Sequence, residues 1–267
     1  MPLTVCAMPI GNLDDVTLRV LAELRDADVV LAEDTRRTRV LLERHGIRAR
    51  LLSYHEHNEA ARVAALVPRL EAGERIALVS DAGMPLVSDP GARLVRAALD
   101  AGVPVTVLPG ASAVETALVA SGLAGDRFAF VGFLPRRAAE LARLWRDSAA
   151  WGATLVAFEA PARLPATLRS LTAFAPEREV AVCRELTKAF EEVVRGSAAE
   201  VAERFTEAPK GEVTLVVGVA AARAADLTAA RAAVAELVAA GAPRGTAAEV
   251  VARLTGAARN DLYRSTL

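Results

Sequence analysis

The sequence predicts an α/β protein with two domains, the first built on a mostly parallel sheet and the second on a mixed sheet, followed by a small helical tail. Short apolar strands alternate with helices through the first half, and this rhythm favours a parallel sheet covered by helices. In the second half, strand-like runs follow one another with fewer helices between them, which favours a mixed or antiparallel sheet. We expect domains at residues 1–113, 114–220 and 221–267.

The first half contains five strand-like runs, at 3–8, 28–32, 51–54, 76–79 and 103–108. Asp14 or Asp15 can cap a first helix that runs through Arg25. Further helices are expected over 58–72, closed by Gly73, and over 90–101, where Pro90 suits a first helical turn. This βαβ order predicts that the strands lie parallel.

The second half contains strand-like runs at 128–131, 154–158, 179–184, 191–194 and 212–219. Three helices are expected between them, at 136–150, 161–174 and 197–206. From residue 220 onward the sequence is helical, with segments at 227–240, 246–254 and 257–263. These short helices resemble a small helix-turn-helix appendage.

Composition narrows the class of protein. The 267 residues carry a net charge of −1, which gives no general attraction to nucleic acid. Charged residues interrupt every apolar run, so no membrane span is expected, and the N-terminus does not resemble a signal peptide. Cys6 and Cys183 both lie in strand-like runs and are best interpreted as small buried hydrophobic residues in a reducing cytoplasm.

The basic residues are unevenly distributed. Six arginines fall between Arg36 and Arg50, and Arg clusters can hold phosphates, although a solvated helix face would look the same. Only Lys188 and Lys210 among 32 basic residues are lysines. Two explanations stay open for a lysine in so arginine-rich a chain: a site that needs a compact ammonium, or chance survival.

Residues 80–91 are the most informative segment. They read Ser-Asp-Ala-Gly-Met-Pro-Leu-Val-Ser-Asp-Pro-Gly and follow the apolar strand at 76–79. Ligands of open α/β sheets bind beyond the carboxyl ends of the strands. This loop offers Asp81, Ser88 and Asp89, and Gly83 lets a ligand approach the backbone closely.

Three further loops are expected at the same edge of the first sheet, at 9–12, 33–39 and 109–113. The second domain contributes residues 158–159, 184–188 and 210–213. A cleft between the domains would then be lined by glycines, small hydroxyls and a few charges. Such a cleft suits an extended polar ligand held largely by backbone groups.

Other kinds of binding or catalytic site fit the sequence less well. The first turn lacks the Gly-x-Gly-x-x-Gly fingerprint of dinucleotide binding, although Glu33 lies where a ribose-binding acid would be. His55 and His57 have no companion cluster, so the metal signal is weak. Neither a nucleophile elbow nor a Walker loop is present.

Several ordered motifs resemble the RsmI-type ribosomal RNA small-subunit methyltransferases of the tetrapyrrole-methylase superfamily. They are Pro9-Ile10-Gly11-Asn12-Leu13, Ala32-Glu33-Asp34-Thr35-Arg36, Tyr54-His55-Glu56-His57-Asn58, Ser80-Asp81-Ala82-Gly83, Ser88-Asp89-Pro90-Gly91, Pro109-Gly110-Ala111-Ser112-Ala113, Gly132-Phe133-Leu134-Pro135, Arg184-Glu185-Leu186-Thr187-Lys188 and Lys210-Gly211-Glu212. The resemblance covers essentially the whole chain. Two departures are Met84, where the family usually has threonine, and Ala111, where proline is common.

The resemblance implies a tetrapyrrole-methylase-like fold and S-adenosylmethionine as the methyl donor. It implies 2′-O-methylation of a cytidine in the decoding region of 16S ribosomal RNA by a homodimeric enzyme. The cysteines predict a cytoplasmic location, and the assembled small subunit is the expected substrate because the chain lacks the overall basicity needed to hold unstructured RNA tightly. The donor needs no metal, so none is expected. Two alternatives stay open: a small-molecule methylase acting on a tetrapyrrole, and a non-catalytic RNA-binding assembly factor.

The resemblance also implies site residues. Those expected to bind the cofactor are Pro9, Ser80, Asp81, Ala82, Gly83, Ser112, Ala113, Phe158, Leu186, Gly211, Glu212 and Val213. A ribose hydroxyl is a poor nucleophile at neutral pH, and the candidates to accept or steer its proton are Asp34, Glu185 and Lys188, unranked. Those expected to contact RNA are Arg36, Arg37, Arg39, His55 and Asn58, and a structural role stays open for His55 and Asn58.

Overall fold

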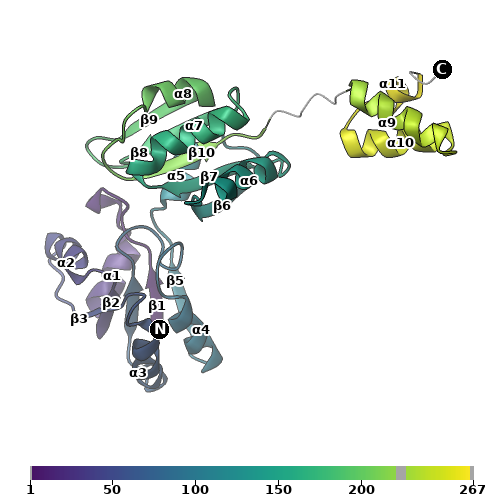
Figure 1. Ribbon diagram of the computed structural model, residues 1–267. Helices are drawn as coiled ribbons and strands as arrows, with labels where there is room; N and C mark the ends of the chain where they lie inside the picture. The colour runs from purple at the N-terminus through teal and green to yellow at the C-terminus, as the bar shows by residue number, and fades with distance from the viewer. Residues whose placement is uncertain (1, 221–226, 265–267) are drawn as a thin grey trace. The chain divides into compact units, whose positions relative to one another are not determined.

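The computed structural model describes residues 2–220 and 227–264, and the chain divides into two compact units, Met1–Val219 and Ala220–Leu267. The first unit contains two five-stranded sheets with helices on their faces (Figure 1). The α/β class, with one parallel sheet and one mixed sheet, is therefore confirmed. No helix within 2–220 or 227–264 has both the length and the apolar character needed to cross a bilayer.

The first sheet is entirely parallel, in the order β3-β2-β4-β1-β5. Its strands are β1 (Leu3–Cys6), β2 (Val29–Ala32), β3 (Leu51–Ser53), β4 (Ile76–Val79) and β5 (Val105–Leu108). Because neighbouring strands run the same way, their carboxyl ends meet at one edge. The loop that follows β4 lies at the middle of that edge, since β4 is the central strand.

Helices cover both faces of this sheet, which explains why its strands are apolar without alternation. The helices are α1 (Leu18–Asp26), α2 (Thr35–Arg44), α3 (Glu59–Glu71) and α4 (Ala92–Asp100). Val30 and Ala77 belong to the cluster packed by α1 and α2. Leu31 and Leu78 belong to the cluster on the opposite face, packed by α3 and α4.

The second sheet has the order β6-β7-β10-β8-β9, and only the β6–β7 pair is parallel. Its strands are β6 (Phe128–Phe133), β7 (Thr154–Glu159), β8 (Glu179–Arg184), β9 (Glu192–Ser197) and β10 (Val213–Val217). Three helices pack on one face: α6 (Ala138–Ala149), α7 (Leu164–Phe174) and α8 (Ala198–Arg204). Helix α5 (Ala113–Ser121) packs on the other face.

Two helices differ from the sequence-based expectation. The sequence predicts a loop at 33–39, but α2 begins at Thr35 because the Asp34 side chain caps it, accepting the Arg36 N–H at 2.9 Å. The helix is hard to recognise in the sequence because arginines dominate its start and its apolar stripe is short, with Leu41 and Leu42 near its end. Helix α5 is not predicted either, because it is apolar on several sides and has no clear helical period.

Two predicted helix starts were wrong. Asp14 and Asp15 belong to the 3-10 turn η1 (Leu13–Asp15), and α1 begins three residues later because Thr17 caps it by accepting the Val20 N–H. Pro90 lies before α4, whose cap is Gly91 with φ +132°. That backbone conformation belongs to glycine, so the helix starts at Ala92.

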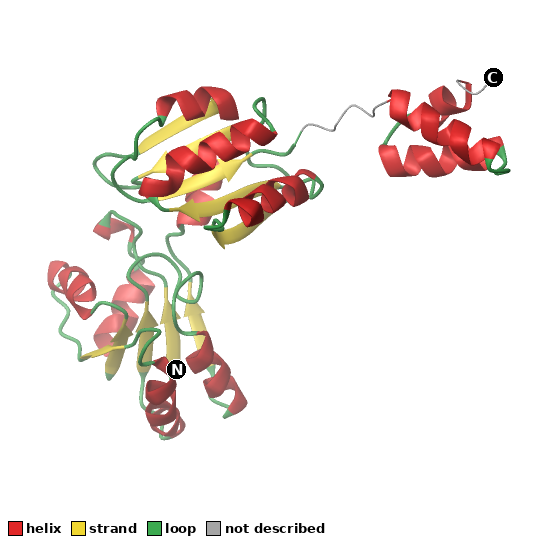
Figure 2. Cartoon of the chain, viewed as in Figure 1, coloured by secondary structure: helices red, strands yellow, loops and turns green. Residues whose placement is uncertain are grey.

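The domain limits remain a proposal. Helix α5 begins at Ala113 and packs on the second sheet, which supports a division near 113/114. The proposed limit at 220/221 adjoins residues 221–226, which lie outside the described part of the chain. Beyond them, α9 (Leu227–Ala239), α10 (Arg244–Thr255) and α11 (Arg259–Arg264) pack around a small apolar core that includes Val234, Val251 and Leu262 (Figure 2).

Candidate functional site

A cavity of about 1110 Å³ lies between the carboxyl edge of the first sheet and strands β6, β7 and β10 of the second sheet. Nine of the twelve residues predicted to bind the cofactor line it: Asp81, Ala82, Gly83, Ser112, Ala113, Phe158, Gly211, Glu212 and Val213. The loop after β4, the turn into α5 and the turn into β10 therefore meet around one space. Its size leaves room for more than one small ligand.

The other three predicted residues, Pro9, Ser80 and Leu186, are buried and do not line the cavity. The buried Ser80 hydroxyl donates to the carbonyls of Ala82 and Gly83, both at 3.1 Å. Leu186 is buried in the apolar cluster between α5 and the second sheet, and Pro9 is buried without lining the cavity. These residues shape the loops that form the cavity wall.

The loop at 80–91 is fixed at both ends. Met8 and Gly83 exchange two backbone hydrogen bonds, of 2.8 and 3.0 Å, which tie the loop to the segment after β1. At the far end, the Gly91 N–H donates to the buried carboxylate of Glu59 at 3.1 Å. Gly83 has φ +69°, so this close pairing depends on glycine.

Six acidic residues line the cavity, and three of them belong to loops of the first sheet: Glu33, Asp81 and Asp89. Asp81 accepts the Asp34 N–H at 2.9 Å and forms an ion pair with Arg37 at 3.5 Å. The Asp89 side chain makes no hydrogen bond or ion pair with any described residue. Burial, followed by repulsion from Glu33 and Asp81, raises the pKa of Asp89 to about 7, and burial and Asp81 also raise the pKa of Glu33.

Asp34 does not line the cavity. Its side chain caps α2 and holds the Arg36 guanidinium through contacts of 3.0 and 2.7 Å. These hydrogen bonds keep the pKa of Asp34 well below its usual range. The carboxylate therefore serves α2 and has little tendency to accept a proton.

Glu185 and Lys188 form a network with Glu212, and only Glu212 lines the cavity. The Lys188 ammonium contacts Glu185 at 2.8 Å and Glu212 at 2.9 Å, and Glu185 also accepts the Glu212 N–H. Burial opposes the charge of Lys188, but the two hydrogen bonds outweigh it and raise the pKa of Lys188. The bond to Lys188 and the Glu212 N–H lower the pKa of Glu185.

The segment after β8, which carries Lys188, also contacts a loop of the first sheet. The Asn12 N–H donates to the Thr187 hydroxyl at 3.0 Å, which links the segment after β1 to the segment after β8. A Cβ on Gly11 would lie 2.5 Å from Cγ of Lys188, so this contact excludes a side chain. Lys188 thus lies where the loops of the two sheets meet.

The residues predicted to contact RNA are spread over two elements. Arg37 lines the cavity, Arg36 is held by Asp34, and Arg39 borders a smaller hollow beside β3. Asn58 shapes the turn before α3, accepting the His55 N–H and donating to the Ser53 carbonyl. His55 and Asn58 do not line the cavity.

The N-terminus of α5 opens onto the cavity. Ser112 precedes this helix and its hydroxyl bonds to Glu115 instead of capping the backbone. The residues of the first helical turn line the cavity. Free N–H groups at a helix N-terminus favour an anion such as a carboxylate.

Phenylalanines form a wall that the sequence analysis largely missed. Phe128, Phe130 and Phe133 of β6 line the cavity together with Phe158 of β7. The two-residue spacing of Phe128 and Phe130 is the signal that could have placed these two rings on one face of the strand. Glu33 and Asp89 also line the cavity, although the sequence analysis assigns neither of them to the cofactor or to catalysis.

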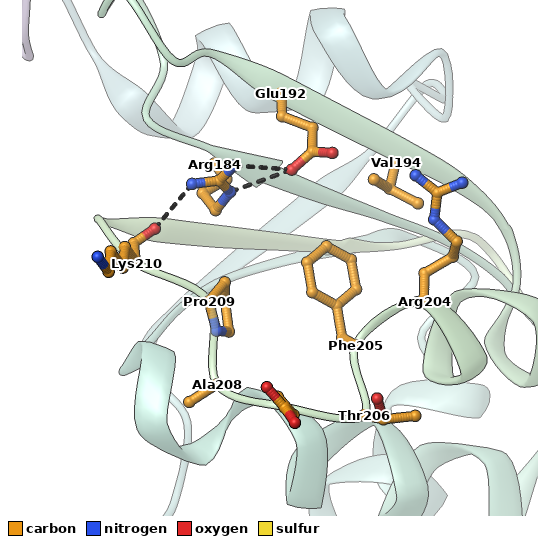
Figure 3. Close-up of a pocket in the computed structure, with 10 residues that line it drawn as sticks. Arg184, Glu192, Val194, Arg204, Phe205, Thr206, Ala208, Pro209 and Lys210 are labelled. Atoms are coloured by element: carbon orange, nitrogen blue, oxygen red, sulfur yellow. Dashed lines mark hydrogen bonds and ion pairs between the residues drawn. The ribbon is translucent and has the colours of Figure 1, made fainter.

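A second hollow of about 460 Å³ is lined by residues of β8, β9 and the segment between α8 and β10 (Figure 3). Arg184 spans it, donating to Glu192 and to the Lys210 carbonyl, and Phe205 forms part of its wall. Arg204 and the Lys210 side chain lie at its edges. The Lys210 backbone therefore has a structural role in the turn into β10.

A family model described as Tetrapyrrole (Corrin/Porphyrin) Methylases matches residues 2–202, which include most of both sheets. The chain belongs to this family. Within the tetrapyrrole methylases, it is 45% identical to the ribosomal RNA small subunit methyltransferase I of Mesorhizobium japonicum, over 99% of this chain and 91% of the relative. The enzyme of the same name from Thermotoga maritima is 43% identical over 80% of this chain and 97% of its own length.

A solved structure of a tetrapyrrole methylase shares the fold. It is the uroporphyrin-III C-methyltransferase of Thermus thermophilus in complex with S-adenyl homocysteine. The TM-score is 0.57 at 22% identity, and the match covers 80% of this chain and 96% of that chain. At this identity the likeness concerns the fold alone.

Proposed function

We propose that this chain transfers the methyl group of S-adenosylmethionine to the 2′-oxygen of a cytidine ribose in 16S ribosomal RNA, at position 1402 in the decoding region. The observation that supports this most is the cavity between the two sheets. One wall consists of backbone-rich loops, one of which carries the unpaired carboxylate of Asp89, and the other wall carries aromatic rings. This combination suits a cofactor beside a nucleotide.

The loops of the cavity fit the cofactor. Bound S-adenosylmethionine supplies an electrophilic methyl group on a sulfonium centre. The first turn of α5 offers N–H groups that suit the carboxylate of an amino acid. Gly83 lines the cavity without a side chain, so a ligand can approach its backbone closely, and the missing side chain of Gly211 leaves room for the Glu185 side chain beside the turn into β10. The carboxylates of Glu33 and Asp81 suit ammonium and ribose hydroxyl groups.

We assign the role of proton acceptor to Asp89. It lines the cavity, its side chain has no partner among the described residues, and its pKa is about 7. A base with a pKa near the working pH is the most effective at removing a proton in the transition state. We give the three predicted candidates for accepting or steering the proton, Asp34, Glu185 and Lys188, supporting roles instead. Asp34 starts α2, and Glu185 and Lys188 hold Glu212.

Substrate binding rests on both walls of the cavity. Arg37 at the cavity, with Arg36 and Arg39 on the same helix, would contact phosphates of the RNA. His55 and Asn58 would support the adjacent loop. Since the net charge is −1, the assembled small subunit suits this enzyme better than naked RNA. We further propose that it acts in the cytoplasm as a homodimer.

The experiment has two stages. Calorimetry should first detect S-adenosylmethionine binding to the purified protein. Methyl transfer should then be measured on small subunits that lack the modification, on protein-free 16S RNA and on a tetrapyrrole. We expect transfer to the subunits only. Transfer to the tetrapyrrole, or cofactor binding without transfer to any RNA, would contradict the proposal, and equal activity on protein-free RNA would contradict the subunit preference.

A further inference from the structure

Four of the seven phenylalanines in the chain line one cavity. Phe128, Phe130 and Phe133 come from β6, the edge strand of the second sheet, and Phe158 comes from the neighbouring β7. Phe130 and Phe158 also pack against the apolar cluster between α5 and the second sheet, whereas Phe128 and Phe133 belong to neither apolar cluster of that sheet. The concentration of aromatic rings is a property of the cavity wall.

A bulge in β6 brings Phe133 into this wall. In a regular strand, Phe130 and Phe133 would face opposite sides of the sheet. Phe130 pairs with Val156, and Phe133 pairs with Phe158, so β6 contains one extra residue over this stretch. Gly132 has φ +69° within it. The extra residue returns Phe133 to the face of Phe130, as β-bulges do when they re-aim a side chain.

The rings are held at defined angles. Phe130 and Phe133 both meet Phe158 edge to face, with centroid distances of 4.9 and 5.6 Å and interplanar angles of 65° and 63°. Edge-to-face contacts fix the orientation of a ring while leaving one of its faces free. Phe133 is 61% exposed and Phe128 is 44% exposed. Both present apolar surface at the cavity that no described residue covers.

We infer that Phe133, together with Phe128 at the other end of β6, is the stacking surface for the base of the target nucleotide. Aromatic side chains bind unpaired bases by stacking on them, and this tolerates any base. The inference deepens the proposed function, on which it rests, by assigning the substrate base to this wall and the cofactor to the loops opposite.

The position of the bulge in β6 agrees with the proposed role of Asp89 as proton acceptor. A Cβ on Gly132 would lie 3.7 Å from the Ser88 hydroxyl, so the bulge lies beside the loop that carries Asp89. A base on Phe133 would therefore bring its own ribose toward that loop. The exposure of Phe133 favours this assignment over a role in holding the adenine of the cofactor, which suits the more enclosed loops.

Variants of Phe133 separate stacking from simple apolar contact. Phe133→Tyr keeps an aromatic face, Phe133→Leu keeps apolar bulk without one, and Phe133→Ala removes both. The control is Phe174→Ala, which removes a partly exposed ring (40%) at the end of α7, outside the cavity. Because Phe133 is largely exposed, each variant should fold, which thermal unfolding followed by circular dichroism would verify.

We expect Phe133→Ala and Phe133→Leu to raise KM for small subunits about ten- to a hundredfold, the range expected for loss of one stacked base. Phe133→Tyr and Phe174→Ala should stay within about threefold of wild type. The Kd for S-adenosylmethionine should be unchanged in all four. Wild-type KM in Phe133→Leu would overturn the inference, and so would weaker cofactor binding in Phe133→Ala, which would assign the ring to adenine.

A binding measurement keeps the inference testable if the proposed function fails. A fluorescein-labelled single-stranded oligoribonucleotide that contains cytidine would be titrated with each protein in the presence of S-adenosylhomocysteine. Weaker binding by Phe133→Ala and Phe133→Leu alone supports the stacking surface even if wild type methylates no subunit. Equal binding by all variants, or none by wild type, overturns it, whereas methyl transfer by wild type tests the function separately.

Discussion

Asp89 illustrates how a residue acquires reactivity from its surroundings. It is a loop aspartate whose position is fixed by the anchored segment between Gly83 and Gly91. Burial and the negative charges of Glu33 and Asp81 disfavour its ionised form and raise its pKa. Asp34, by contrast, follows directly on Glu33 of the cavity wall but is committed to α2 and Arg36. Partners, more than residue type, decide which carboxylate can accept a proton.

Replacement of Asp89 tests this role. If Asp89 accepts the proton, it must be deprotonated, so kcat/KM of wild type should rise as the pH increases through its pKa of about 7 and then level off. Asp89→Asn should lower kcat about a hundredfold or more and abolish this rise. Glu33→Gln removes a neighbouring negative charge, so the pKa of Asp89 should fall and the rise should move to lower pH. Steady-state kinetics between roughly pH 5.5 and 9, on both sides of that pKa, checks this, and an unchanged profile in Asp89→Asn would assign the base elsewhere.

We expect that arginine cannot replace Lys188. Its ammonium fits between Glu185 and Glu212, and its stem lies against Gly11. Lys188→Arg keeps the charge but adds a planar fork, which should displace Glu212 at the cavity. A misplacement of about 1 Å can cost on the order of a hundredfold in rate.

Single-turnover methylation at saturating donor measures this effect. Lys210→Arg is the matched control, since Lys210 bonds to Arg184 through its backbone carbonyl and its side chain makes no hydrogen bond or ion pair within the described residues. A Lys188→Arg rate within about threefold of wild type would mean that the lysine was retained by chance.

At the scale of the element, a strand, helix or loop can be predicted from the sequence when the residues that determine it are neighbours in the chain. The strands of both sheets and the loop at 80–91 are predictable because apolar runs, Gly and Pro are local signals. Helix α5 is not, because its apolar residues have no one-sided pattern. The wall at Phe133 depends on a register shift between β6 and β7, and a register between strands cannot be read from either strand alone. The raised pKa of Asp89 likewise depends in part on Glu33, which follows a different strand of the sheet.

Helix α2 should be the main element that binds phosphate. Replacing Arg36, Arg37 and Arg39 with alanine should weaken binding to the small subunit and flatten its salt dependence, by about 0.7 in log–log slope for each phosphate that the protein no longer neutralises. Cofactor affinity should remain nearly intact. The control is the pair Arg19→Ala and Arg25→Ala on α1. Salt titrations that give the same slope for wild type and the α2 variant would exclude these arginines from phosphate binding.

At the scale of the whole molecule, the two sheets form one compact unit while the C-terminal helices form another. The cavity is built entirely within the first unit, from loops of the first sheet and strands of the second.

A protein truncated after residue 219 should therefore fold and bind S-adenosylmethionine. We expect cooperative thermal unfolding and a Kd within about twofold of the full chain, because no residue of the cavity is removed. Calorimetry on both proteins provides the comparison. Loss of cofactor binding in a folded truncated protein would show that the C-terminal helices contribute to the site.

The central claim concerns which atom receives the methyl group. The most direct measurement is to incubate unmodified small subunits with the protein and isotopically labelled S-adenosylmethionine, and then to treat the 16S RNA with alkali. A 2′-O-methyl group blocks alkaline cleavage at its own nucleotide, so we predict that the label appears in a single alkali-resistant dinucleotide that begins with cytidine. Label in a mononucleotide would mean base methylation, and no label in the RNA would contradict the proposed function altogether.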